Sequence, residues 1–417
     1  MAVTSGGEDM VKYLSQYLKI DLNESLTSIA IPSYIVSLGI NAFSMCFQLE
    51  KITIPPSVKV IGKGCFRSCI SLKEIEIQPQ IEQIDDFVFY GCVSLEKVVL
   101  PSSVKAIGYQ SFYKCSSLTD ISLNNVSSIK DEAFGECESL NTITFSSSLC
   151  YLNEGLFFAC FNLSEFVIPS SIRSIGSSLF SHCYSLKKVV IPTSITKLPN
   201  YAFNCCKSLT EIDIPSSITS IGFYAFFGCK SLVKITIPES VTNIECGAFC
   251  DCSSLEEIIV PSSIQSLEYA TFSRCESLKN IVMTDSITSI GNYVFYGCKS
   301  LKEVSIPSTV ASIGKGTFKG CAALTKIELP SSMNIIEKSL LKYCSSLSEI
   351  KIPSSITRIE KYAFKGCSAL TQITFPSSII ILDKTILQNC SSLEKVFAPR
   401  HIPWFEISDN VQIFEHY

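Results

Sequence analysis

Cysteine is the residue type whose number and spacing could most readily support chemistry in this chain. There are 21 cysteines but only three histidines, His182, His401 and His416. Thiolates bind metal ions and act as nucleophiles, and paired thiols oxidise to disulfides. Sixteen of the cysteines recur at intervals of 23 residues, with one interval of 22: Cys46, Cys69, Cys92, Cys115, Cys137, Cys160, Cys183, Cys206, Cys229, Cys252, Cys275, Cys298, Cys321, Cys344, Cys367 and Cys390. This regularity indicates a column of stacked side chains.

The cysteine column predicts mostly free, buried thiols, because free cysteine is small and buries readily. A metal site would need clustered ligands of the C-x-x-C type, which the chain lacks, so we expect no metal ligand. Stacked Cα atoms would lie about 5 Å apart, within disulfide range, which leaves some pairing open. However, the Cβ vectors of in-register residues run parallel, whereas a disulfide needs them to converge.

A catalytic site is the other chemistry that these residues could supply. His182 lies next to Cys183, but adjacent residues point apart, whereas an activated nucleophile needs spatial convergence with its base. The chain contains no phosphate-binding glycine loop, no H-E-x-x-H and no G-x-S-x-G. We therefore predict that the protein is not an enzyme, with no catalytic residue and no cofactor.

The elements that must position these side chains repeat every 23 residues. One unit, 209–230, reads LTEIDIPSSITSIGFYAFFGCK. Its apolar residues predict a first strand over 209–214 that Pro215 ends, since proline cannot donate to a ladder. A second extended segment over 218–221 follows, and then a glycine that is expected to adopt backbone angles that other residues resist. A short helical turn is predicted over 225–229.

The period holds over nearly the whole chain, which indicates a solenoid whose units bury their apolar faces against each other. The leucine that opens each unit recurs seventeen times: Leu26, Leu49, Leu72, Leu95, Leu118, Leu140, Leu163, Leu186, Leu209, Leu232, Leu255, Leu278, Leu301, Leu324, Leu347, Leu370 and Leu393. A phenylalanine column runs from Phe43 to Phe364, with Leu341 and Leu387 as apolar replacements.

With L-x-x-I-x-I-P, I-x-x-I-G and A-F-x-x-C recurring in register, residues 23 to about 399 resemble the BspA-like class of leucine-rich repeat proteins. The resemblance implies a right-handed, curved stack of short parallel strands with short helical turns on the outer side. We expect residues 1–22 to form a helical N-terminal cap and residues 400–417 a C-terminal cap. BspA-like proteins are known as microbial surface antigens that adhere to host proteins, so the resemblance implies protein binding. The alternative is an intracellular scaffold that recruits signalling or cytoskeletal partners.

Composition and charge limit the classes of partner that we expect for this chain. The net charge is −4, from 34 basic and 38 acidic residues, so nucleic acid is not an expected partner. No run of about 18 apolar residues predicts a membrane span. The first residues lack the charged region and apolar core of a secretory signal, which favours the cytoplasm. Family resemblance favours the cell surface, and both locations stay open.

The outward position between the two isoleucines of the first strand varies from unit to unit. In leucine-rich repeat proteins the comparable strand lines the concave face, so the resemblance implies that a protein ligand, such as a host extracellular-matrix protein, binds here. The candidate protein-binding residues are Val167, Val190, Asp213, Ile259 and Val282. Ordinary strand propensity is the alternative explanation for the exposed valines and isoleucine.

A second candidate surface is a lysine ridge near the C-terminus. It comprises two columns four residues apart: Lys315, Lys338, Lys361 and Lys384, and Lys319, Lys342 and Lys365. Such a ridge could attract a sulfated glycan, an anionic lipid surface or an acidic protein. Alternatively, the neighbouring acidic column of Glu337, Glu360 and Asp383 neutralises the lysines.

Overall fold

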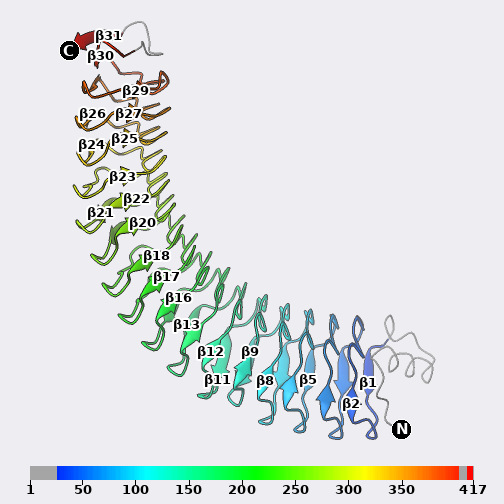
Figure 1. Cartoon of the computed structure of the whole chain (residues 1–417). Coiled ribbons are helices and arrows are strands. Elements are labelled where there is room, and N and C mark those ends of the chain that lie inside the picture. The colour runs from blue at the N-terminus through cyan, green and yellow to red at the C-terminus, as the bar shows by residue number, and fades with distance from the viewer. Residues whose placement is uncertain (1–25, 403–410, 417) are drawn as a thin grey trace. The chain divides into compact units, whose positions relative to one another are not determined.

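The computed structural model describes residues 26–402 and 411–416, which divide into two compact units. Unit 1 extends to Lys207, and unit 2 begins at Ser208. Each unit is a stack of similar coils, one for each repeat (Figure 1). The predicted cap over residues 1–22 lies outside the described residues, as do residues 403–410 and 417 of the predicted cap over 400–417.

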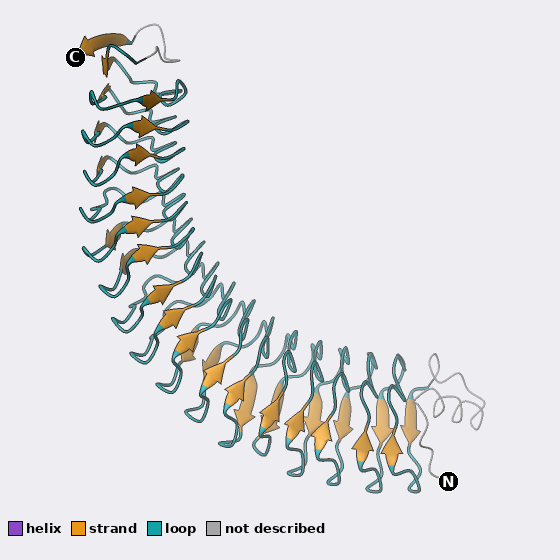
Figure 2. Ribbon diagram, in the orientation of Figure 1, coloured by secondary structure: helices purple, strands orange, loops and turns teal. Residues whose placement is uncertain are grey.

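Each coil of unit 1 contributes a first strand and a shorter second strand (Figure 2). The first strands are β1 (Ser28–Ala30), β3 (Lys51–Thr53), β5 (Glu74–Glu76), β7 (Lys97–Val99), β9 (Asp120–Leu123), β11 (Thr142–Phe145), β13 (Glu165–Val167) and β15 (Lys188–Val190). The second strands are β2 (Ser37–Leu38), β4 (Val60–Ile61), β6 (Gln83–Ile84), β8 (Ala106–Ile107), β10 (Ser128–Ile129), β12 (Tyr151–Leu152), β14 (Ser174–Ile175) and β16 (Lys197–Leu198).

Unit 2 repeats this arrangement with gaps among its first strands. The first strands are β19 (Glu257–Ile259), β21 (Asn280–Val282), β24 (Lys326–Glu328), β26 (Glu349–Lys351), β28 (Gln372–Thr374) and β30 (Lys395–Pro399). The second strands are β17 (Ser220–Ile221), β18 (Asn243–Ile244), β20 (Ser266–Leu267), β22 (Ser289–Ile290), β23 (Ser312–Ile313), β25 (Ile335–Ile336), β27 (Arg358–Ile359) and β29 (Ile381–Leu382). A last strand, β31 (Gln412–His416), pairs with β30.

Strand pairing is parallel and in register, so each residue meets its counterpart in the next repeat. Ile29 pairs with Ile52 between β1 and β3, and Ile258 pairs with Ile281 between β19 and β21. Like side chains therefore form continuous columns, as the 23-residue period predicts.

The prediction of short helical turns is wrong, since the described residues contain no helix. In the first coil, Asn41, Phe43 and Met45 donate their N–H groups to carbonyls of the next coil, at 2.7 to 2.9 Å. Ser44 and Cys46 donate within the coil to the carbonyl three positions earlier, at 3.0 and 3.2 Å. An α-helix needs consecutive donors directed to the carbonyl four residues back. Alternate donors here bind the next coil instead, so the segment forms consecutive turns.

These turns require left-handed backbone on either side of the buried phenylalanine. Asn41 and Met45, two residues before and after Phe43, have φ of 56° and 63°. The same pair of positions has positive φ around Phe180 (Ser178 and His182) in unit 1, and equivalent residues do so in unit 2. Because left-handed backbone costs about 1–2 kcal/mol for an L-residue, contacts between coils must compensate for it.

The repeat glycine after the second strand has a different role from the one predicted. At Gly62 and Gly108, φ lies outside the left-handed region. A Cβ at Gly62 would lie 2.9 Å from the Gly39 carbonyl carbon, and one at Gly108 would lie 2.5 Å from the carbonyl carbon of Asp85. Glycine at these positions therefore allows close approach of adjacent coils.

The core of each unit is a set of apolar columns. Phe43 and Phe66 stack with ring centroids 5.7 Å apart in unit 1, and Phe226 and Phe249 stack at 5.3 Å in unit 2. All four side chains are fully buried. Aromatic burial and stacking supply much of the stabilisation, because a phenylalanine removes about 150–250 Å² from water.

The cysteine column packs behind the phenylalanines, and all cysteines of the described residues are free thiols. The Cys69 Sγ donates to the Phe43 carbonyl of the preceding coil at 3.0 Å, and the Cys252 Sγ donates to the Phe226 carbonyl at 3.1 Å. Burial raises the pKa of the Cys92 thiol to about 12. A thiol that stays protonated and satisfied is a poor nucleophile, so this column is structural.

A serine column joins neighbouring coils in the same way. The Ser103 Oγ donates to the Ile81 carbonyl at 2.7 Å, and the Ser240 Oγ donates to the Ile218 carbonyl at 2.7 Å. These hydroxyls follow the proline that ends the first strand. They satisfy carbonyls that the short second strands leave unpaired.

Candidate binding surfaces

The first-strand face consists of the outward side chains of the first strands and of the equivalent segments between them. In unit 1, Val167 and Val190 pair in register between β13 and β15. Their side chains are 67% and 45% exposed. Two adjacent β-branched residues there form a small apolar spot, as the sequence predicted.

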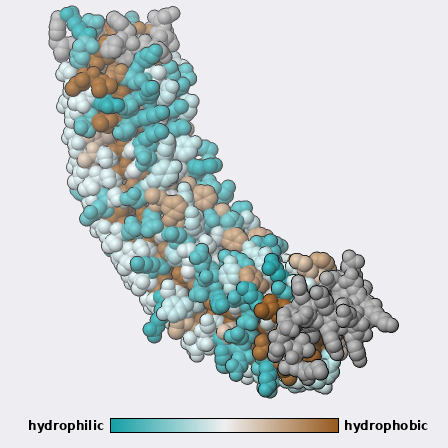
Figure 3. Space-filling model, turned by 45° about the vertical axis from the view of Figure 1, so that its right-hand side comes forward, coloured by the Kyte–Doolittle hydropathy of each residue, from teal (hydrophilic) through white to brown (hydrophobic). Residues whose placement is uncertain are grey.

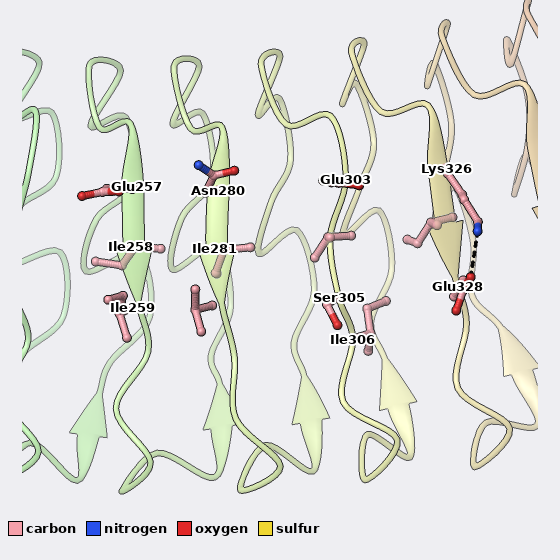
Figure 4. A pocket seen from close by; sticks show the side chains of 13 residues that line it. Glu257, Ile258, Ile259, Asn280, Ile281, Glu303, Ser305, Ile306, Lys326 and Glu328 are labelled. Carbon is pink, nitrogen blue, oxygen red and sulfur yellow. Dashed lines mark ion pairs between the residues drawn. The ribbon is translucent and has the colours of Figure 1, made fainter.

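In unit 2, Ile259 and Val282 form the equivalent pair between β19 and β21, and they are 64% and 52% exposed. They line a groove of about 700 Å³ that crosses four coils. Figure 4 shows Glu257, Asn280, Glu303 and Lys326 on successive coils of this groove, and Ile259 beside the same strand as Glu257. The groove thus combines an apolar end with a charged row. On the face visible in Figure 3, apolar residues likewise lie among hydrophilic ones.

The groove coincides with a lapse in strand pairing. The segment 303–305 has no strand assignment, whereas Asn280–Val282 and Lys326–Glu328 on either side are β21 and β24. The sheet β19-β21 therefore ends before this coil, and the sheet β24-β26 begins after it. A continuous ladder does not prevent such a hollow, because a smaller pocket of about 350 Å³ lies over the paired strands β3, β5 and β7 of unit 1.

The charged side chains that line the groove differ in whether they form ion pairs. Lys326 Nζ lies 2.9 Å from Glu328 Oε1, which raises the pKa of Lys326 and lowers that of Glu328. Glu257 is paired with Lys234 at 3.3 Å. Within the described residues, Glu303 has no cationic group within 4.0 Å. Glu303 therefore presents a carboxylate to the groove.

Asp213 lies on the same face of unit 2, two coils before Ile259. It forms an isolated parallel bridge with Thr236 and does not line the groove. The structure thus brings Ile259 and Val282 together, places Asp213 outside their groove, and places Val167 and Val190 in unit 1.

The lysine ridge lies on the turn segments of unit 2, beside the phenylalanine column. Within the described residues, none of its first six lysines has a carboxylate oxygen within 4.0 Å: Lys315, Lys319, Lys338, Lys342, Lys361 and Lys365. The acidic column does not neutralise them by direct pairing. Glu360 binds Arg358, and Asp383 accepts hydrogen bonds from the N–H and hydroxyl of Thr385.

Tyrosine rings, which the sequence reasoning missed, contact several of these lysines. Lys342 Nζ lies 4.8 Å from the ring centroid of Tyr343 and 5.1 Å from that of Tyr362. Lys365 Nζ lies 5.0 Å from the Tyr362 centroid. Lys319 contacts Tyr296 at 5.2 Å. The available signal was the position of each tyrosine, close in sequence or about one repeat from a ridge lysine.

His182 and Cys183 do not form a nucleophile and base. The Cys183 Sγ is buried and donates to the Phe157 carbonyl at 3.1 Å, and burial raises the pKa of its thiol to about 12. The His182 Nδ1 lies 2.9 Å from the Ser181 Oγ. Burial, and to a smaller extent nearby Lys207, lowers the pKa of the His182 imidazole.

Over the described part of the chain, no group of three or more His, Cys, Asp or Glu side chains could hold a metal ion. No helix there is long and apolar enough to cross a membrane.

Comparison with known proteins gives a consistent family. The family model of the BspA type leucine rich repeat region, which describes six copies of the repeat, matches residues 21–119, 105–232, 196–321 and 288–411. No curated protein matches the chain. A leucine-rich repeat protein from Bacteroides ovatus is 28% identical, with a TM-score of 0.68, over 94% of this chain and 92% of its own. A leucine rich cell surface protein from Faecalibacterium prausnitzii is also 28% identical, over 92% of this chain and 88% of its own, with a TM-score of 0.41.

Proposed function

The chain belongs to the BspA-type leucine-rich repeat family, and from this premise we propose that it is a non-enzymatic protein-binding solenoid whose first-strand face holds the partner. The observation that carries the proposal is the groove of about 700 Å³ at Ile259 and Val282. The proposal is supported by the gathering of exposed apolar side chains in one hollow, beside a carboxylate with no ion pair.

The groove supports one class of partner over others. Ile259 and Val282 offer apolar contact, and Glu303 offers a carboxylate to a basic side chain. A protein segment with an apolar residue near a lysine or arginine would fit both features. A host extracellular-matrix protein is the partner that family resemblance favours. Val167 and Val190 are a second, smaller contact area on unit 1.

The test replaces the two apolar side chains. Ile259→Asp/Val282→Asp is expected to abolish capture of the partners that the immobilised wild-type chain retains. Val60→Asp is the matched control, because Val60 is 52% exposed on β4, a second strand. The proposal fails if the double variant, folded by circular dichroism, captures the same proteins as the wild type and Val60→Asp.

The location of the protein in the cell distinguishes a surface adhesin or antigen from an intracellular scaffold. Surface biotinylation of intact cells, with a cytosolic marker as control, would label a surface adhesin or antigen. Protection until the cells are permeabilised would favour an intracellular scaffold, and the partner would then be sought among signalling or cytoskeletal proteins.

A further inference from the structure

Six of the seven lysines of the lysine ridge lie on three successive coils of unit 2. In each coil the first lysine lies three residues before the buried apolar residue of the phenylalanine column, and the second lies one residue after it. The three pairs are Lys315 and Lys319, Lys338 and Lys342, and Lys361 and Lys365. Successive coils are separated by about 4.8 Å, the spacing of paired strands. The cationic charges therefore repeat along the axis of the stack.

Direct neutralisation within the chain does not account for this density of positive charge. Among the described residues, no carboxylate lies within 4.0 Å of these six ammonium groups. Glu360, the nearest acidic neighbour in sequence to Lys361, is held by Arg358 instead. Lys365 donates to the amide oxygen of Gln388 at 2.9 Å, which leaves its charge uncompensated.

Aromatic rings position part of the ridge. Lys342 lies over both Tyr343 and Tyr362, and Lys365 lies over Tyr362. A cation over an aromatic face is held in place without losing its charge. The lysine side chains of the middle of the ridge are thus partly ordered before any partner arrives, which lowers the entropic cost of binding.

We propose that the lysine ridge binds an anionic polysaccharide whose sulfate or carboxylate groups repeat along the chain. A linear polyanion can follow the axis of the stack and pair with lysines on each coil. This site is separate from the first-strand face, so it would add a glycan ligand to a protein-binding solenoid.

The aromatic geometry favours a polysaccharide over a single-stranded nucleic acid. Nucleic-acid channels use free aromatic faces on which bases stack. Here, ammonium groups already lie over Tyr343 and Tyr362. Lysine also acts as a point charge for sulfate or carboxylate and lacks the planar fork with which arginine reads bases.

The experiment measures binding of the full chain to immobilised heparin at ionic strengths of about 0.05 and 0.15 M. The Lys319→Gln/Lys342→Gln/Lys365→Gln variant is expected to bind about tenfold more weakly at the lower salt, since three exposed charge pairs are lost. The control Lys97→Gln/Lys188→Gln/Lys351→Gln removes the same charge from the first-strand face and is expected to bind as the wild type does.

A second variant tests the aromatic contribution. Tyr362→Gly removes the ring beneath Lys342 and Lys365, and glycine is compatible with the φ of 61° at this position. It is expected to weaken heparin binding a fewfold without lowering the melting temperature.

Three outcomes would overturn the proposal: no heparin binding by the wild type, equal loss in both triple variants, or tighter binding to oligo-dT or phosphatidylserine vesicles than to heparin. Ile259→Asp/Val282→Asp should bind heparin normally, so failure of the ridge and failure of the protein groove give different patterns.

Discussion

The turn segments around Asp86 and Glu136 in unit 1 and those of the lysine ridge in unit 2 have the same left-handed turn positions but differ in charge pairing. In unit 1, Lys130 lies 2.9 Å from Asp86, and Lys114 lies 3.6 Å from Glu136. In unit 2, the position equivalent to Asp86 is Lys361, which has no carboxylate within 4.0 Å in the described structure. The core columns are shared while the exposed side chains diverge. A solenoid can therefore present different surfaces on one scaffold, because each exposed position is free of the packing that fixes the core.

If the two units have equivalent cores, alkaline pH should destabilise both of them. This is the largest effect that we expect. Burial raises the pKa of Cys92 and Cys183 in unit 1 and of Cys321 in unit 2 to about 12 from a normal value of 9.0. The folded state keeps the neutral thiol, so its stabilisation is complete below pH 9 and is lost as pH rises toward 12. For each such thiol, the free energy of unfolding should fall by about 1.4 kcal/mol when the pH is one unit above the pKa of that thiol in the unfolded chain.

Chemical denaturation at pH 8, 9 and 10 measures this loss. The native chain should also resist a thiol reagent at the column positions at pH 8, whereas the urea-unfolded chain should react at once. Equal stability at pH 8 and pH 10 would contradict the assignment of these thiols to a buried, protonated column.

Removal of one ring from the phenylalanine column should have the next largest effect, and it should be similar in the two units. Phe89→Ala in unit 1 and Phe249→Ala in unit 2 each empty a fully buried site between stacked neighbours. Each is expected to lower the free energy of unfolding by about 3–5 kcal/mol. Urea denaturation followed by circular dichroism measures both, and a cost for one variant below half that of the other would show that the cores are not equivalent.

Backbone strain in the turns gives a smaller and opposite pair of effects. Met45 in unit 1 has a φ of 63° and is 52% exposed, while the equivalent Gly320 in unit 2 has a φ of 77°. Met45→Gly should stabilise unit 1 by about 1 kcal/mol, and Gly320→Ala should destabilise unit 2 by a similar amount. Ile40→Gly is the control, because Ile40 is also exposed but has no positive φ, so glycine there should destabilise. Thermal unfolding measures all three variants. A lower melting temperature for Met45→Gly, or a higher one for Gly320→Ala, would contradict the prediction.

The smallest expected effect concerns the surface charges themselves. Lys130→Gln in unit 1 removes the partner of Asp86 and should cost about 0.5 kcal/mol at low salt, since exposed ion pairs contribute little. Lys342→Gln in unit 2 breaks no ion pair, and the loss of its contacts with Tyr343 and Tyr362 is offset by reduced repulsion between lysines, so the free energy of unfolding should stay nearly unchanged. Added salt should remove the difference between the two variants, and a difference that persists in salt would point to packing instead.

Much of the fold could be predicted from the sequence because the period makes the columns explicit. Like residues at intervals of 23 must stack when parallel strands pair in register, as Ile258 and Ile281 do. Burial of the phenylalanine, leucine and cysteine columns follows from this alone. The same regularity identified the exposed positions, including Ile259 and the lysine ridge.

The turn segments could not be predicted in this way. A-F-x-x-C has a spacing typical of one helical turn, yet its alternate N–H groups donate to the next coil. Local propensity cannot decide between helix and turns when backbone carbonyl groups of the next coil compete for the same N–H donors. The groove is a second example, since nothing in the sequence of residues 302–306 marks the lapse in strand pairing there.

The repeat, the in-register columns and the positions that face solvent all follow from the 23-residue period, because a strict period fixes which residues meet their counterparts. The folded arrangement of the coils was needed to show which carboxylates reach which cations, where the first-strand face opens into a groove, and how the turn amides are satisfied. Arg358 rather than a ridge lysine binds Glu360, for example. Such choices depend on the direction of each side chain and on competition between adjacent coils, neither of which is encoded in spacing along the chain.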